Sequence, residues 1–172
     1  IEFGAGVGVI GSFLCKSRFN RIAFNVSPAL KVVAFLVNAE ASEALAASKK
    51  LLDAGTDGLK FYAATPGRNG VVLPEGAMRA GVEEAHSRGK VVFAHPSSGA
   101  GLRASVRAGV DVLTHTTPQS GPWDESVLAA MKQTGVALIP TLKLWKYEFR
   151  HERASLADGF VETAIGQLRA WL

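Results

Sequence analysis

Residues 89–123 read GKVVFAHPSSGAGLRASVRAGVDVLTHTTPQSGPW, and this stretch decides the fold. A glycine precedes a short Val-rich run that ends in His95, a segment of helical period follows, and a second glycine and Val-rich run end in His115. Short β-branched runs that alternate with longer helical segments are typical of parallel strands joined by helical crossovers. The stretch therefore predicts one strand, helix, strand unit.

The same unit recurs along the chain, as AGTDGLKF at 54–61, RGKVVFAH at 88–95, AGVDVLTH at 108–115 and TGVALIPT at 134–141. We predict strands at Val32–Val37, Gly58–Tyr62, Val91–Ala94, Val110–Thr114 and Val136–Ile139. We predict helices at Ser42–Ala54, Pro74–Arg88, Ala100–Ala108 and Asp124–Thr134, then near Lys143–Arg153 and Asp158–Leu172. Asp124 can cap the fourth of these helices, and Gly135 follows its end, where a left-handed residue is useful. This pattern indicates an α/β protein with a parallel sheet, either a doubly wound sheet or part of a (β/α)8 TIM barrel.

The chain has 172 residues, of which 48% are hydrophobic and 20% charged, as expected for a globular domain with a packed core. A complete (β/α)8 barrel takes about 250 residues, so five strands favour a partial barrel. We assign residues 31–172 to this partial barrel domain and leave residues 1–30 as an unclassified glycine-rich N-terminal segment. Because the chain begins with Ile1 rather than Met, we expect a processed, excised or incompletely sequenced product.

Composition argues against several classes of protein. The longest apolar run, residues 32–37, is far shorter than the roughly 18 residues of a membrane-spanning helix. The net charge of +4 comes from dispersed cations, which favours a solvated basic surface over a nucleic-acid site. The single cysteine, Cys15, cannot form an intrachain disulfide, so we expect a cytoplasmic setting.

Lys60, His95 and His115 stand at or near the ends of successive strands, where the loops of an α/β sheet or barrel build the active site. Histidine is the commonest zinc ligand among side chains, and a buried neutral lysine can react with carbon dioxide to give an anionic carbamate ligand. The three residues therefore form a candidate metal site. Each residue alone also fits a plainer role, as a hydrogen-bonded structural histidine or a surface lysine.

Side-chain alternation along the strands supplies a test of this site. If the lysine faces the barrel interior, Leu59 and Phe61 must face the helices. By the same alternation Phe93 shares the face of the first histidine, and Leu113 shares the face of the second.

A polar loop and two aromatic residues follow these strands. Thr116, Thr117 and Gln119 could contact substrate or cap the next helix, and both alternatives stay open. Trp145 and Tyr147 could line a substrate pocket, although aromatic residues on an amphipathic helix more often pack against the core.

The remaining histidines and serines carry less chemistry. We expect His86 and His151 to be solvated, since both lie in charged helical segments. Ser97 and Ser98 adjoin the strand-end histidine, but no patterned acid partner or GxSxG elbow supports a nucleophile.

The glycines Gly6, Gly8 and Gly11 match the spacing GxGxxG of a dinucleotide-binding turn. No carboxylate follows at the expected offset of about 20 residues, so the match is weak. A non-catalytic nucleotide-binding module is nevertheless the alternative to a metal enzyme, and an inactive structural fragment is a third hypothesis.

From about Val32 to Trp171 the chain resembles the metal-dependent amidohydrolase superfamily, in the branch of imidazolonepropionase-like and dipeptidase-like enzymes. The resemblance rests on DAGTDGLKFY, residues 89–123 and GVALIPTL. It implies a (β/α)8 barrel that binds one or two divalent metals, most commonly zinc, and hydrolyses amide, lactam or ester bonds through a metal-activated water. By resemblance, Lys60 matches the carboxylated lysine of strand four, and His95 and His115 match the histidines of strands five and six.

Two parts of the family pattern are absent from the sequence. No His-x-His pair precedes these residues, and no strand ends in the Asp that serves as ligand and proton shuttle. We therefore expect a fragment, about strands three to seven, that is weakly active or inactive alone and whose catalytic residue is unknown. The substrate expected for the parent enzyme is a small amide, dipeptide or cyclic amide.

An arc of five strands leaves two apolar strand edges open, at residues 32–37 and 136–139. We expect the N-terminal segment or a second copy of the chain to cover them. The sequence IAFNV at 22–26 could supply one more short strand for this purpose, and self-association is the other expected outcome.

Overall fold

The computed structural model describes residues 21–27, 30–35, 40–64, 71–149 and 154–172. Within these residues a six-stranded sheet keeps the order of the sequence, from β1 to β6. β1 (Arg21–Ser27) runs antiparallel to β2 (Leu30–Phe35). All later neighbours are parallel, and they are β3 (Gly58–Tyr62), β4 (Val91–His95), β5 (Val112–Leu113) and β6 (Ala137–Leu138).

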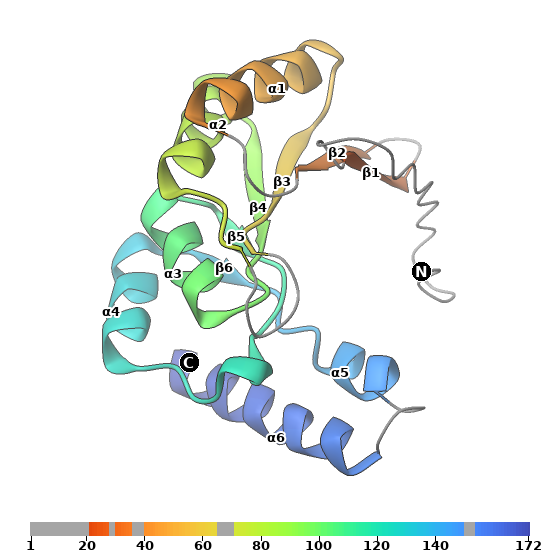
Figure 1. Cartoon of the computed structure of the whole chain (residues 1–172), viewed down its shortest axis with the longest axis vertical. Helices are drawn as coiled ribbons and strands as arrows, with labels where there is room; N and C mark the ends of the chain where they lie inside the picture. The colour runs from red at the N-terminus through yellow and green to blue at the C-terminus, as the bar shows by residue number, and fades with distance from the viewer. Residues whose placement is uncertain (1–20, 28–29, 36–39, 65–70, 150–153) are drawn as a thin grey trace.

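Helices connect the parallel strands. They are α1 (Ala41–Asp53), α2 (Glu75–Ser87), α3 (Gly99–Ala108) and α4 (Glu125–Thr134), with a short 3₁₀ helix η1 (Pro118–Ser120) before α4. Figure 1 shows α1 to α4 along one side of the sheet only. A doubly wound sheet would carry helices on both faces, so this arrangement is an arc of a (β/α)8 barrel, as the sequence predicts.

Two further helices, α5 (Leu142–Phe149) and α6 (Ala154–Trp171), follow β6 and pack against each other near the end of the chain (Figure 1). α6 begins four residues before the expected start. For the helix expected at Lys143–Arg153, the structure gives α5 an end at Phe149, and residues 150–153 lie outside the described part of the chain.

β5 and β6 have two residues each and are shorter than the expected strands. Single hydrogen bonds continue the pairing on either side of β5: the amide of Asp111 donates to Val92 O at 3.0 Å, and that of Thr114 to Ala94 O at 2.8 Å. The ladder around β5 is therefore short, and the residues that follow it depend on other contacts for their position.

The strand expected at 22–26 exists as β1, and it pairs along the outer edge of β2, with Ile22 opposite Ala34 and Phe24 opposite Val32. This confirms that the N-terminal segment covers the first edge of the arc. Within the described residues no strand pairs with the outer edge of β6. Cys15, His151 and the glycines of the GxGxxG pattern lie outside the described residues, and the domain division at residue 30 stays a prediction.

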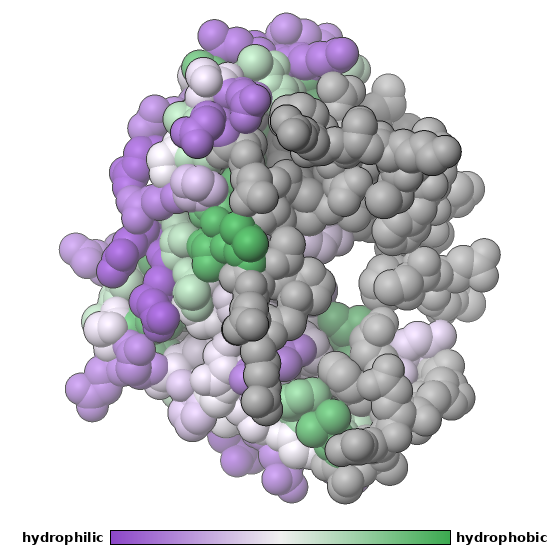
Figure 2. Space-filling view, in the orientation of Figure 1, coloured by the Kyte–Doolittle hydropathy of each residue, from purple (hydrophilic) through white to green (hydrophobic). Residues whose placement is uncertain are grey.

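The core lies between the sheet and its helices. Leu59, Phe61, Val92 and Ala94 are fully buried there, and Met78 and Val82 of α2, Leu102 and Val106 of α3, and Val127 and Met131 of α4 belong to the same apolar cluster. Figure 2 shows hydrophilic residues along the outer side of the helical layer. No helix among the described residues is long and apolar enough to cross a membrane.

The ends of α4 follow the predicted local chemistry. The Asp124 carboxylate accepts a hydrogen bond from the amide of Val127 at 2.9 Å, so it caps the helix as expected. Gly135 ends the helix with φ of +68°, the left-handed conformation that favours glycine.

Candidate functional site

Lys60 and His95 lie on the face of the sheet that carries no helices. Their neighbours along β3 and β4 are fully buried against the helices, whereas Lys60, Tyr62, Phe93 and His95 are partly exposed. Tyr62 is opposite His95, and Lys60 is opposite Phe93. Residues opposite each other in a parallel ladder point to the same side, so these four side chains share the open face. The predicted alternation is confirmed for both strands.

The second histidine reaches this face by another route. Leu113 is opposite Ala94 and is fully buried in the core, so the expectation that His115 shares the face of Leu113 is wrong. The ladder ends at Thr114, whose amide and hydroxyl both donate to Ala94 O, at 2.8 and 2.9 Å. His115 therefore escapes strand alternation, and its ring meets that of His95 edge-on, with 4.3 Å between centroids and 68° between planes.

Two aromatic rings extend this histidine pair. Tyr62 stacks on His95 with 4.8 Å between ring centroids, and Lys60 Nζ lies 5.9 Å from the Tyr62 ring centroid. On the other side the Trp145 ring stands edge-on to His115 at 6.5 Å. Sequence reasoning missed Tyr62, although its spacing of two residues from Lys60 on the same strand was the available signal.

Burial governs the charges of the cluster. It lowers the pKa of Lys60 to about 8 and raises the pKa of Tyr62. Burial, followed by the charge of Lys60, lowers the pKa of His95 to about 4. Burial, followed by the charges of His95 and Lys60, lowers the pKa of His115 to about 2. Both imidazoles are therefore neutral near pH 7, the form in which histidine binds metals.

Thr141, which follows β6, contacts His115 directly. Its Oγ1 lies 2.8 Å from His115 Nδ1, and its backbone has φ of +48°. A β-branched residue in the left-handed region is strained, and such strain persists where surrounding contacts over-determine it. Thr141 is a second site residue that sequence reasoning missed, because its contact joins positions 26 residues apart.

The loop after His115 is held by protein contacts. Thr116 and Thr117 are each 1% exposed, and their hydroxyls accept hydrogen bonds from Trp145 Nε1 at 2.9 Å and Trp123 Nε1 at 2.8 Å. Neither threonine caps α4, since Asp124 does, so the capping alternative is wrong for this pair. Contact with substrate stays a prediction. Gln119 is exposed on η1.

The two candidate pocket aromatics differ in their surroundings. Trp145 is 7% exposed and combines packing with a place beside His115. Tyr147 is 44% exposed. Of the two, only Trp145 lies at the histidine pair in the described structure.

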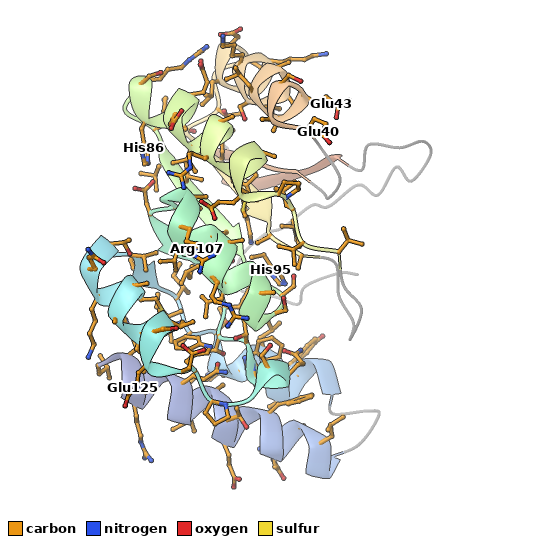
Figure 3. All side chains as sticks on the ribbon, turned by 60° about the vertical axis from the view of Figure 1, so that its left-hand side comes forward. Glu40, Glu43, His86, His95, Arg107 and Glu125 are labelled. Carbon is orange, nitrogen blue, oxygen red and sulfur yellow. The ribbon has the colours of Figure 1, made fainter. Side chains whose placement is uncertain are left out.

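The other residues considered in the sequence are placed differently. Ser98 Oγ accepts from the amide of Gly101 at 3.1 Å and caps α3. The buried Ser97 Oγ has no hydrogen-bond partner, so no base activates it as a nucleophile. His86 is not simply solvated: its Nε2 lies 2.9 Å from Asp111 Oδ2, and Figure 3 shows it on the outer side of the molecule, away from His95.

A cavity of about 250 Å³ lies between the N-terminal ends of α3 and α4, lined in part by Ser98, Arg103, Ser120 and Asp124. It does not include the two histidines or Lys60. Its capping groups are already bonded within the protein, Ser98 to Gly101 and Asp124 to Val127. The histidine pair on the open face is therefore the stronger candidate site.

The donor set of the cluster is incomplete. Among the described residues no group of three or more His, Cys, Asp or Glu side chains could hold a metal ion. The described residues bring together two imidazoles and the amine of Lys60. A catalytic zinc site normally uses three protein ligands, so the unmodified amine leaves the set one ligand short.

Comparisons with known proteins concern the fold of the chain. No family model and no curated protein matches the sequence. Solved structures do match. A proposed prolidase from Bifidobacterium longum superposes with a TM-score of 0.64 at 25% identity, over 80% of this chain and 38% of its own.

The chain has the fold of part of a protein described as an amidohydrolase. A Xaa-Pro dipeptidase with methionine bound in its active site matches with a TM-score of 0.60 at 17% identity, over 76% of this chain and 34% of its own. The ochratoxinase of A. niger matches with a TM-score of 0.63 at 22% identity, over 76% of this chain and 32% of its own. The chain thus spans about a third of the length of these solved structures.

Proposed function

We propose that this chain is part of a metal-dependent hydrolase of carbon–nitrogen bonds, and that Lys60, His95 and His115 are its metal ligands. The observation that carries the proposal is the edge-on contact of His95 and His115 on the open face that Lys60 shares. The two histidines lie at or just beyond the carboxyl ends of parallel strands, where barrel enzymes place their catalytic residues. The likeness to a dipeptidase and to a protein described as an amidohydrolase supports the reaction class.

The histidines fit a divalent metal in their protonation and orientation. Both are neutral at pH 7, so neither must lose a proton to bind. When the N–H at His115 Nδ1 donates a hydrogen bond to Thr141 Oγ1, 2.8 Å away, the other ring nitrogen, Nε2, carries a lone pair that can bind a metal. A hydrogen bond to the second ring nitrogen fixes the tautomer and orientation of metal-binding histidines.

Lys60 would supply the anionic ligand. Its lowered pKa, about 8, raises the fraction of neutral amine at physiological pH. The neutral nitrogen forms a bond to the carbon of carbon dioxide and releases one proton, which leaves a carbamate with two oxygen donors. The parent enzyme would hold one or two divalent metal ions, and zinc is the metal we propose. A bound divalent metal would act as a Lewis acid that activates water and polarises the scissile carbonyl.

Other residues shape the site without binding metal. Tyr62 stacks on His95 and Trp145 borders His115, so both rings limit the access of water to the imidazoles. A small amide, dipeptide or cyclic amide fits the proposed reaction. The acid that moves the proton is unassigned, so the chain alone should hydrolyse such substrates poorly. A cytoplasmic setting remains a prediction from the single cysteine.

Zinc binding tests the proposal. Isothermal titration of the purified chain should show weak zinc binding that His95→Ala or His115→Ala abolishes. His86→Ala is the matched control, because His86 lies away from His95 and should leave binding unchanged. Zinc binding that survives both site substitutions, or that His86→Ala removes, would contradict the assignment.

Two further measurements examine the lysine and the activity. Native mass spectrometry in bicarbonate should show the mass of one carbon dioxide added to the wild-type chain and not to Lys60→Ala. Rapid dipeptide hydrolysis by the purified chain, abolished by His95→Ala, would show that the chain is more complete than we propose.

A further inference from the structure

His115 and the two threonines after it lie beyond the end of β5, where the sheet no longer fixes the backbone. A candidate ligand in such a position needs another support. The described structure provides that support from the far end of the chain, through a residue of α6.

Gln167 of α6 reaches this loop through its side-chain amide. The Thr117 amide donates to Gln167 Oε1 at 2.9 Å, and Gln167 Nε2 donates to Thr117 O at 3.0 Å. Gln167 Nε2 also donates to Gly121 O at 2.5 Å. The side chain therefore bonds both backbone groups of Thr117, as a neighbouring strand would.

The network fixes the orientation of this amide. The Thr117 N–H requires an acceptor and the two carbonyls require donors, so exchanging the oxygen and nitrogen of Gln167 would oppose like groups at all three contacts. Gln167 is 1% exposed, and both of its N–H donors are used. A buried amide satisfied in this way is rigid, because every alternative geometry loses hydrogen bonds that water cannot replace.

Two tryptophans complete the support of the loop. Trp123 Nε1 donates to Thr117 Oγ1 at 2.8 Å. Trp145 Nε1 donates to Thr116 Oγ1 at 2.9 Å, and its ring also borders His115. The three residues from His115 to Thr117 are thus each held by a different part of the chain that follows.

We propose that Gln167 is a positioning residue for His115. By bonding the backbone of Thr117, two residues further on, it holds the imidazole against His95 and makes α6 part of the site. The metal-binding consequence rests on the proposed function, whereas the placement of the His115 ring does not. No contact of Gln167 with metal or substrate is implied.

Gln167→Glu is the sharpest test, because the variant keeps the size and the acceptor but has no N–H for Thr117 O and Gly121 O. Imidazole NMR spectra of the metal-free chain should lose the proton contact between the His95 and His115 rings, and the His115 nitrogen resonances should shift. Zinc affinity should fall by about tenfold or more, as for other residues that orient metal ligands. Arg169→Gln, an exposed change on the same helix, is the control and should alter neither readout.

The outcomes separate the two proposals. A folded Gln167→Glu chain that keeps the ring contact and the wild-type zinc affinity would overturn the positioning role, even if its stability were lower. If the wild-type chain binds no zinc but Gln167→Glu still loses the ring contact, the positioning role stands and the metal proposal fails. If Gln167→Glu does not fold, Gln167→Met is the second variant, because it keeps the approximate size of the side chain and removes all three hydrogen bonds without adding a charge. An unchanged ring contact in that variant would overturn the inference.

Discussion

Replacement of Gly101 by alanine should damage both the stability of the chain and the histidine pair. Gly101 lies in the first turn of α3, and a Cβ there would overlap the carbonyl oxygen of Pro96. The Pro96 carbonyl carbon would be 3.1 Å away and Ala63 Cβ 3.3 Å away. The overlapping oxygen belongs to the backbone and already accepts from the Ser98 amide at 2.7 Å, so it cannot rotate aside.

The expected loss follows from two opposed effects. Overpacking of a close-packed site costs about 1–3 kcal/mol, and contact with an immovable backbone atom places Gly101→Ala at the upper end. Alanine is favoured over glycine inside a helix by about 1 kcal/mol, which offsets part of this cost. The net loss should be about 2 kcal/mol, or a fall in Tm of roughly 4–8 °C for a chain of this size.

Thermal and urea unfolding followed by circular dichroism would measure the effect. Gly76→Ala in α2 and Gly166→Ala in α6 are matched controls, because a Cβ at either position would meet no atom within 4 Å. Both controls should gain up to about 1 kcal/mol. Since Pro96 follows His95, only Gly101→Ala should also disturb the contact between the two histidine rings. A Gly101→Ala chain as stable as the controls would refute the reasoning.

Three other predictions concern separate parts of the molecule. Asp111→Ala should lower the free energy of unfolding by about 1–2 kcal/mol, because the Asp111 carboxylate accepts a hydrogen bond from an amide of β4 at 2.7 Å. His86→Gln removes only the exposed ion pair with Asp111 and should cost less than about 1 kcal/mol. Comparable losses for the two variants in urea unfolding would contradict this prediction. Hydrogen bonds from the Ser126 hydroxyl and a backbone amide hold the pKa of Asp124 below its ordinary value. The stabilising cap is therefore present at neutral pH and lost as the pH falls through the folded-state pKa, so the stabilities of the wild-type and Asp124→Ala chains should converge in acid. A difference in stability that stays constant with pH would refute the assignment. Because the outer edge of β6 is unpaired in the described structure, light scattering should show self-association that grows with protein concentration. Ile139→Lys should reduce this association, since Ile139 is 46% exposed beside that edge. A chain that stays monomeric at all concentrations would contradict the prediction.

Several helices and strands can be predicted from short stretches of sequence. The alternation of Val-rich runs with helical segments predicted β3 with its observed bounds and β4 to within one residue. Turn and cap chemistry predicted the start of α4 at Asp124 and its end at Gly135. These features depend on residues within a few positions of one another, so a local pattern suffices to predict them.

The sequence also predicted which neighbours point away from Lys60 in β3 and which residue shares the face of His95 in β4, because strand alternation carries that information within each strand. It failed for His115, since the ladder stops at Thr114 and alternation has no meaning beyond a ladder. The strand pattern alone suits both a doubly wound sheet and a barrel, and the partial barrel was favoured by the chain length and the number of strands.

The sequence by itself determined that Lys60, His95 and His115 lie at or near the carboxyl ends of successive parallel strands, because periodicity and turn chemistry act between near neighbours. Only the tertiary structure decided how the second histidine meets the first. Thr141 lies 26 residues from His115, and Gln167 lies 50 residues from Thr117. Such contacts form when the packing of α5 and α6 against the arc brings these side chains to the loop, and no local pattern encodes that packing.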